Sequence, residues 1–140
     1  MDKTTYKHSE LTSEIIKAAQ NVHNILGYGF LEKVYHNAMM MELDKAGLKA
    51  VAEKPVTVYY CDRIAGEYFA DIVIEDKVIL EIKAVEAINS SHEAQLVNYL
   101  KATNIDVGLL LNFGKSLMVK RKIFETARRD RLDADYADWR

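Results

Sequence analysis

The sequence of 140 residues has almost none of the features that mark disulfide-bonded, zinc-binding or membrane proteins. Its one cysteine, Cys61, can form no internal disulfide and no cysteine cluster for zinc, so we interpret it as an ordinary strand-end residue. No run of about 18 apolar residues is present, which excludes a transmembrane helix. The first residues, MDKTTYKHSELTSEII, lack the apolar region of a signal peptide, and we therefore expect a cytoplasmic protein.

An excess of charge of either sign is absent as well. Lys and Arg total 19 and Asp and Glu total 21, which gives a net charge of −2. A general polyanion binder would be more basic, so contact with nucleic acid would need a local basic surface. The length suits one domain, and 49% hydrophobic with 29% charged residues is typical of a soluble globular protein. We expect a single domain over 1–124 and a charged tail over 125–140.

Hydrophobic periodicity predicts two helices in the N-terminal third. Apolar residues at helical spacing indicate a helix over about 11–26, which ends at Gly27. A second helix is predicted over 31–46, with Gly47 as its C-terminal stop. The three methionines at 39–41 are interpreted as core packing rather than as a cofactor site.

After Pro55 the pattern changes to that of strands interrupted by one helix. Three strands joined by short turns are predicted near 56–60, 67–74 and 78–84. The segment NSSHEAQLVNYLKAT predicts a third helix with a capping box from Ser90 to Glu93. Strands at 106–113 and 117–124 follow. The tight turns predict an antiparallel meander and the helical crossover a parallel pair, so we expect an α/β fold with a mixed sheet.

Charged residues interrupt the otherwise apolar hairpin FADIVIEDKVILEIKA. A three-residue loop at 75–77 would place Asp71 opposite Glu81, with their Cβ atoms about 5 Å apart on one face. Lys83 would share that face because alternate residues of a strand point to the same side. The bland alternative is a half-exposed hairpin whose charges are simply solvated.

Two facing carboxylates without a partner would destabilise the hairpin, whereas a divalent cation between them reverses the sign of the interaction. Carboxylate oxygens suit Mg²⁺ or Mn²⁺, both of which keep several waters for a substrate. The ammonium group of Lys83 would orient a water or stabilise charge that develops on a phosphate.

The hairpin resembles the signature of the PD-(D/E)XK nuclease superfamily, an Asp followed after a variable gap by Glu-x-Lys on the next strand. Here Asp71 is followed, after nine residues, by Glu81-Ile82-Lys83, and Ala70 replaces the usual Pro before the Asp. Within the superfamily the chain resembles the small GxxExxY proteins through Gly29-Phe30-Leu31-Glu32-Lys33-Val34-Tyr35, and the likeness covers about 9–124. It implies a restriction-endonuclease-like fold, an α-β-β-β-α-β core whose mixed sheet is flanked by helices.

The resemblance also implies a role for each matching residue. Asp71 and Glu81 would bind the metal together with the Ile82 carbonyl, and Lys83 would be the catalytic lysine. Glu32, at the start of the second helix, would complete the metal and catalytic site. The alternative for Glu32 is a first-turn glutamate that the helix dipole favours.

On the third helix, Gln95 and Tyr99 resemble the Gln-x-x-x-Tyr motif of the exonuclease-like branch of the superfamily. Four residues apart, they share one helix face, so Gln95 would act in catalysis and Tyr99 would contact substrate. The alternative is a surface glutamine beside a core tyrosine. His92 is interpreted as a residue of the capping region rather than as a ligand or base.

The resemblance thus implies a Mg²⁺- or Mn²⁺-dependent nuclease that hydrolyses phosphodiester bonds, with DNA favoured by analogy alone. Lys120 and Lys122 would follow a phosphate backbone, unless they belong to a merely solvated edge strand. The tail offers further candidate contacts to nucleic acid: Arg128, Arg129, Arg131, Tyr136 and Trp139. The alternatives are a merely solvated tail and, for Tyr136 and Trp139, packing against a second copy of the chain. A non-catalytic nuclease-fold module that binds nucleic acid or a partner is the alternative function. Many nucleases of this fold act as dimers, so the resemblance is compatible with a homodimer, for which the sequence holds no decisive interface signal.

Overall fold

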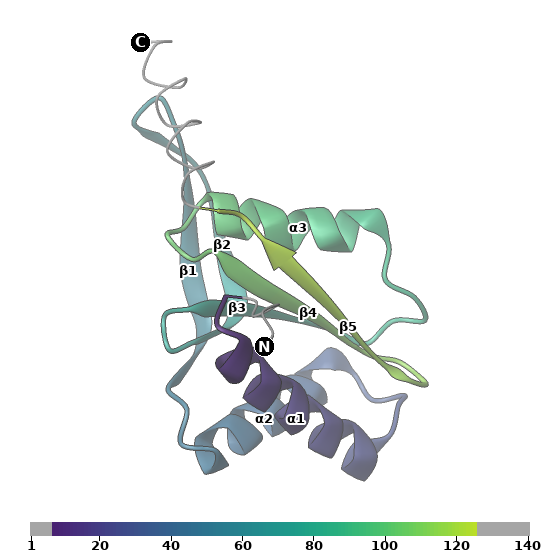
Figure 1. The fold of residues 1–140 in the computed structure, drawn as a ribbon. Coiled ribbons are helices and arrows are strands. Elements are labelled where there is room, and N and C mark those ends of the chain that lie inside the picture. Colours follow the sequence, from purple (N-terminus) through teal and green to yellow (C-terminus); the bar gives the residue numbers. More distant parts are fainter. Residues whose placement is uncertain (1–6, 126–140) are drawn as a thin grey trace.

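The computed structural model describes residues 7–125 of the chain. They form a five-stranded sheet with helices on both faces (Figure 1), which confirms the expected α/β fold. The elements in chain order are α1 (Ser9–Leu26), α2 (Glu32–Lys45), β1 (Ala50–Tyr60), β2 (Arg63–Ile74), β3 (Val78–Lys83), α3 (Ser90–Lys101), β4 (Val107–Phe113) and β5 (Leu117–Ile123).

The sheet has the mixed topology that the turns and the crossover predict. Its strand order is β1-β2-β3-β4-β5, with β3 and β4 parallel and the other neighbours antiparallel. β1 begins at Ala50, earlier than predicted, because its pairing with β2 continues past Pro55. A proline is tolerated there because β1 is an edge strand.

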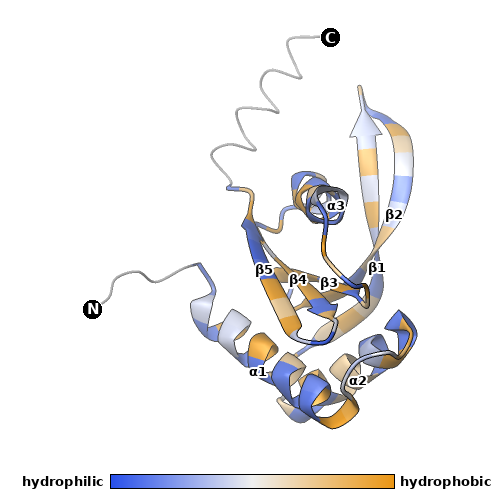
Figure 2. Ribbon diagram, turned by 90° about the vertical axis from the view of Figure 1, so that its right-hand side faces the viewer, coloured by the Kyte–Doolittle hydropathy of each residue, from blue (hydrophilic) through white to orange (hydrophobic). Residues whose placement is uncertain are grey.

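Two hydrophobic cores hold the helices against the sheet, one on each face (Figures 1 and 2). On one side α1 and α2 pack over residues such as Leu80 and Leu109. On the other side α3 packs through Leu96 and Leu100. β4 is buried along its whole length, as its continuous apolar sequence predicts. No helix within residues 7–125 is long and apolar enough to span a membrane.

The N-terminus of α3 differs from its predicted cap. Asn89, rather than Ser90, caps the helix: its side chain accepts a hydrogen bond from the His92 N–H at 3.0 Å. The His92 ring in turn accepts one from the Asn89 N–H at 3.1 Å, so the capping-region interpretation of His92 is confirmed. Asn is at least as good an N-cap as Ser. The cap therefore lies one residue earlier, which leaves Glu93 outside the box.

A two-stranded arm extends from the sheet beside α3 (Figures 1 and 2). β1 and β2 pair almost throughout, whereas β2 pairs with β3 only between Ile72 and Ile74. Residues 54–70, which we call the β-arm, therefore continue past β3. The tip turns at Cys61 and Asp62, which both have positive φ, the conformation typical of a tight hairpin turn.

Candidate active site at the fork between two strands

The turn that joins β2 to β3 sets the register of the candidate site. Glu75 and Asp76 have φ of 55° and 54°, and the Lys77 N–H donates to the Ile74 carbonyl at 2.9 Å. Ile74 pairs with Val78 and Ile72 with Leu80. Continued by one residue, this register brings Asp71 opposite Glu81, so the predicted loop and register are confirmed.

At Asp71 the two strands separate, and side chains replace the backbone ladder between them. The Asp71 N–H donates to Glu81 Oε2 at 2.8 Å, and the Ile82 N–H donates to Asp71 Oδ2 at 2.7 Å. Each carboxylate thus accepts a hydrogen bond from the backbone of the opposite strand. Both carboxylates lie where β2 and β3 fork.

Burial makes this pair of carboxylates electrostatically costly. Glu81 is 3% exposed, and desolvation together with the neighbouring charge of Asp71 raises the pKa of Glu81 to about 8. Burial also raises the pKa of Asp71, although the Ile82 amide, His36 and Lys83 act in the opposite direction. Without a cation Glu81 therefore keeps its proton near neutral pH, as expected of a poorly solvated carboxyl group that lies close to a second one.

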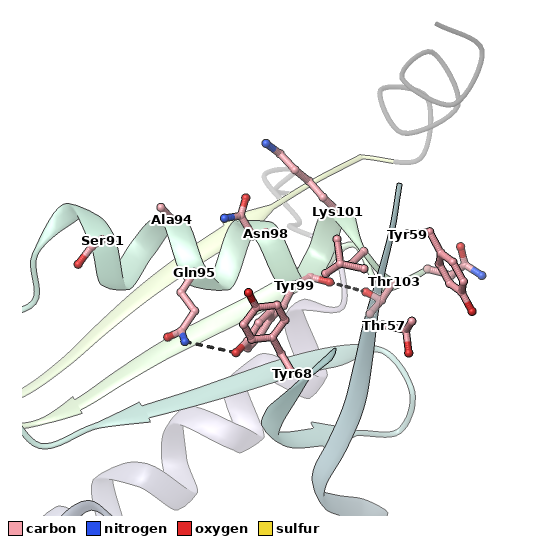
Figure 3. Close-up of a pocket in the computed structure, with 13 residues that line it drawn as sticks. Thr57, Tyr59, Tyr68, Ser91, Ala94, Gln95, Asn98, Tyr99, Lys101 and Thr103 are labelled. Atoms are coloured by element: carbon pink, nitrogen blue, oxygen red, sulfur yellow. Dashed lines mark hydrogen bonds between the residues drawn. The ribbon is translucent and has the colours of Figure 1, made fainter. Parts of the chain in front are cut away.

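Lys83 lies close enough to the carboxylates for its charge to lower the pKa of both, and side chains of α3 hold it in place. Figure 3 shows the Gln95 and Tyr99 part of this chain of hydrogen bonds. Lys83 Nζ donates to Gln95 Oε1 at 3.2 Å, and Gln95 Nε2 donates to the Tyr99 hydroxyl at 3.3 Å. Tyr99 is 6% exposed, and burial followed by the charge of Glu81 raises its pKa. Three residues that the sequence singled out are thus joined in one hydrogen-bonded chain.

Glu32 approaches the fork from the opposite layer, at the start of α2. Its side chain is exposed, and its charge contributes to the raised pKa of Glu81. The loop before it is fixed by the buried Tyr35, whose hydroxyl donates to the Gly27 carbonyl and accepts from the Phe30 N–H. Among residues 7–125, no three acidic, His or Cys side chains converge into a ready-made metal site. Asp71 and Glu81 therefore form the compact pair, and Glu32 stands further out.

Sequence reasoning missed His36, which follows Glu32 by one helical turn. Its Nε2 lies 3.0 Å from the Asp71 carbonyl oxygen, so Nε2 carries the proton and donates to it. Its buried Nδ1 has no hydrogen-bond partner. The i, i+4 spacing from Glu32, which puts both residues on one helix face, is the sequence signal that could have identified it.

The basic residues of the last strand are arranged as their alternation predicts. Lys120 and Lys122 pair with residues of β4 that face α3, whereas Arg121 points to the other face and donates to Thr12 Oγ1. Lys122 forms an ion pair with Glu93 on α3, and Lys120 is exposed. The tail candidates Arg128, Arg129, Arg131, Tyr136 and Trp139 lie outside the described residues.

The donor set at the fork fits a hard divalent cation. Both side chains offer carboxylate oxygens, which such ions prefer to sulfur or imidazole. Desolvation is the largest cause of the raised pKa of Asp71 and of Glu81, and the charge of Lys83 offsets it only in part. A cation with charge +2 would neutralise the negative charge of the two carboxylates, which protons neutralise when no cation is bound.

Comparisons with known proteins agree with this geometry. The model of the PD-(D/E)XK nuclease superfamily, whose members generally use divalent metals, matches residues 9–124. No curated protein matches the chain. One similar solved structure, "Crystal structure of SSO0001", has a TM-score of 0.53 and 20% identity over 94% of this chain and 68% of that chain, which supports the fold alone. With its signature residues gathered at one fork and the family match spanning most of its length, the chain belongs to the PD-(D/E)XK nuclease superfamily.

Proposed function

We propose that this protein is a metal-dependent nuclease that hydrolyses phosphodiester bonds in DNA. The observation that carries the proposal is the fork itself, where the buried carboxylate of Glu81 faces the half-buried carboxylate of Asp71 beside a lysine that α3 holds in place. A protein that used the fork only for stability would gain from replacing one carboxylate by a neutral side chain. The motif from Gly29 to Tyr35, which contains Glu32, further supports a place among the small GxxExxY proteins.

Mg²⁺ or Mn²⁺ would be held by Asp71, Glu81 and the Ile82 carbonyl, with Glu32 as an outer acidic residue. When bound, the ion lowers the pKa of a coordinated water and offsets negative charge on the phosphate. The hydrogen bond from the Ile82 N–H fixes one oxygen of Asp71, and that from the Asp71 N–H fixes one oxygen of Glu81. Ligands that are already oriented need little reorganisation when the ion binds.

Lys83 supplies the positive charge that the chain itself brings to the reaction. Its ammonium group would orient the attacking water or stabilise charge on the phosphate in the transition state. Gln95 holds that ammonium group through its amide oxygen, and Tyr99 holds the amide of Gln95. Because a charge placed in advance costs no reorganisation during the reaction, the relay would contribute to rate through positioning.

Lys120 and Lys122 would contact the phosphate backbone away from the fork. Lys122 would exchange its partner Glu93 for a phosphate, whereas Lys120 is already exposed. Such contacts would make binding dependent on salt without adding sequence preference.

The proposal is tested by cleavage of labelled DNA and RNA with Mg²⁺ or Mn²⁺. We expect cleavage of DNA by the wild type and none by Lys83→Ala or Asp71→Asn, with the thermal transition retained. Lys17→Ala, which removes an exposed lysine from α1, is the matched control and should cleave like the wild type. Full activity of Asp71→Asn would refute the assignment of the fork as the catalytic centre.

One observation favours a second candidate, a nuclease-fold module that binds nucleic acid or a partner without cleaving. Within the described residues only two acidic groups form the compact pair, and Glu32 does not complete a three-residue cluster. Calorimetry with Mn²⁺ separates the two candidates when it is run beside the cleavage assay. Binding of Mn²⁺ that depends on Glu81, with no cleavage of any nucleic acid, would support the module.

A further inference from the structure

A groove with a cavity volume of about 840 Å³ runs between α3 and the β-arm (Figure 3). The arm contributes Tyr59 and Tyr68, and α3 contributes Asn98 and Tyr99. Gln95 lines it too, so one end of the groove is the relay that holds Lys83. The groove is therefore continuous with the candidate active site and is not a separate feature of the surface.

The lining of the groove is polar but almost uncharged. Of the described residues that line it, only Lys101 is charged, and the rest offer phenol, hydroxyl, amide and small apolar groups. A surface that follows a phosphate backbone needs several Lys or Arg side chains. Asparagine amides, which both donate and accept, instead match the edges of nucleobases.

Two tyrosines present ring surface to the groove. Tyr68 is 51% exposed and Tyr59 is 62% exposed, although both lie on the arm that forms its wall. Tyr68 leans on the buried Tyr99, with ring centroids 6.0 Å apart and planes tilted by 43°. Its ring is thus supported on one side and open on the other. Ring faces that are held in this way are the platforms on which unstacked bases bind in single-strand binding proteins.

We infer that this groove is a nucleobase subsite for an unpaired segment of DNA. The phosphate next to the bound base would then lie at Lys83. This inference rests on the proposed nuclease function and names the form of its substrate. In a duplex the ring faces are stacked and the pairing edges are occupied. Only an unstacked base can offer its face to Tyr68 and its edge to Asn98. The cavity volume also lies in the range of pockets for small ligands, about 300–1,000 Å³, rather than that of a duplex channel.

The inference is tested by fluorescence anisotropy in EDTA, where no cleavage occurs. The probes are a labelled oligo(dT) strand, a strand of equal length with abasic sites throughout, and a duplex. We expect oligo(dT) to bind at least tenfold tighter than either of the other two probes. Tyr68→Leu should lose about tenfold affinity for oligo(dT) and none for the abasic strand.

Tyr60→Leu is the matched control, because Tyr60 lies on the same arm and is 68% exposed but does not line the groove. It should bind all three probes like the wild type. An equal loss for oligo(dT) and the abasic strand in Tyr68→Leu would overturn the inference. So would equal affinity for strand and duplex, absence of strand binding, or tighter binding of oligo(rU) than of oligo(dT).

The failure of this inference and that of the proposed nuclease function give different results. Binding in EDTA requires neither metal nor cleavage, so base-dependent binding can be found in a protein that cuts nothing. Conversely, metal-dependent cleavage that Lys83→Ala abolishes, with no effect of Tyr68→Leu on strand affinity, would leave the nuclease in place and remove the subsite.

Discussion

Replacement of Glu81 by Gln should stabilise the metal-free protein at alkaline pH. Glutamine has nearly the same shape, and its amide oxygen can still accept the hydrogen bond from the Asp71 N–H. Its side chain carries no charge that would be desolvated or would repel Asp71, and these are the two largest causes that raise the pKa of Glu81. The substitution therefore removes the electrostatic cost and keeps the packing.

The size of the effect follows from the pKa of Glu81, which burial and Asp71 raise from 4.5 to about 8. Between these values the folded protein keeps a proton that the unfolded chain has released, so the free energy of unfolding falls as pH rises. The whole difference corresponds to at most about 5 kcal/mol. Allowing for relaxation of the buried site, we expect wild type to lose about 3 kcal/mol relative to Glu81→Gln between pH 5 and pH 8.

Urea unfolding in EDTA at pH 5 and pH 8 measures this difference directly. The two proteins should have similar free energies of unfolding at pH 5, and the variant should be the more stable at pH 8. Saturating Mn²⁺ at pH 8 should raise the stability of the wild type and have little effect on the variant, because binding to the native state alone is stabilising. Together, the two measurements test whether the stability that the carboxylates at the fork cost at pH 8 is recovered when the proposed metal binds.

The reasoning would be refuted if the two proteins changed in parallel with pH. It would equally fail if Glu81→Gln were less stable than the wild type at pH 8 in EDTA. Either result would mean that Glu81 gains more from its hydrogen bond with the Asp71 N–H than it loses by burial.

Three other predictions concern the surroundings of the site. His36→Ala should weaken Mn²⁺ binding about tenfold by calorimetry, because the hydrogen bond to the Asp71 carbonyl steadies a ligand; Asn37→Ala should not. Tyr35→Phe should cost about 1–2 kcal/mol in urea unfolding, since two hydrogen bonds to a buried hydroxyl are lost, and an unchanged midpoint would contradict their role. Gly108→Ala should cost about 1–3 kcal/mol, because its Cβ would lie 2.7 Å from Leu96 Cδ1. If the clash is the cause, pairing it with Leu96→Ala should cost less than the sum of the two single changes.

Local rules were enough to predict the central hairpin. A three-residue loop and the alternation of side chains predicted the pairing of Asp71 with Glu81, and the structure has that register. The mixed sheet also followed, since tight turns require antiparallel neighbours and a helical crossover permits a parallel pair. These features depend on residues close together in the chain, and for that reason they can be predicted from it.

Contacts between distant residues were harder to predict. At Asp71 the pairing of β2 with β3 has ended while its pairing with β1 continues, and no local pattern in the sequence predicts where the two ladders end. The hydrogen bond of His36 depends on the packing of α2 against β2. The ion pair of Glu93 with Lys122 likewise depends on the packing of α3 against β5. The wrong cap at Ser90 had a different cause, because Asn89 and Ser90 are nearly equal as caps.

The sequence by itself thus determined the order of the elements and the hairpin register, and it supplied the candidate residues of the proposed nuclease site. Only the tertiary structure decided that Glu81 is buried and Asp71 half-buried at a fork, and this desolvation is the largest cause of their raised pKa. It also decided that the β-arm stands beside α3 and leaves a groove next to Lys83. The physical reason is that desolvation and enclosure depend on all the neighbours of a group in space, whereas periodicity and turns depend on neighbours along the chain.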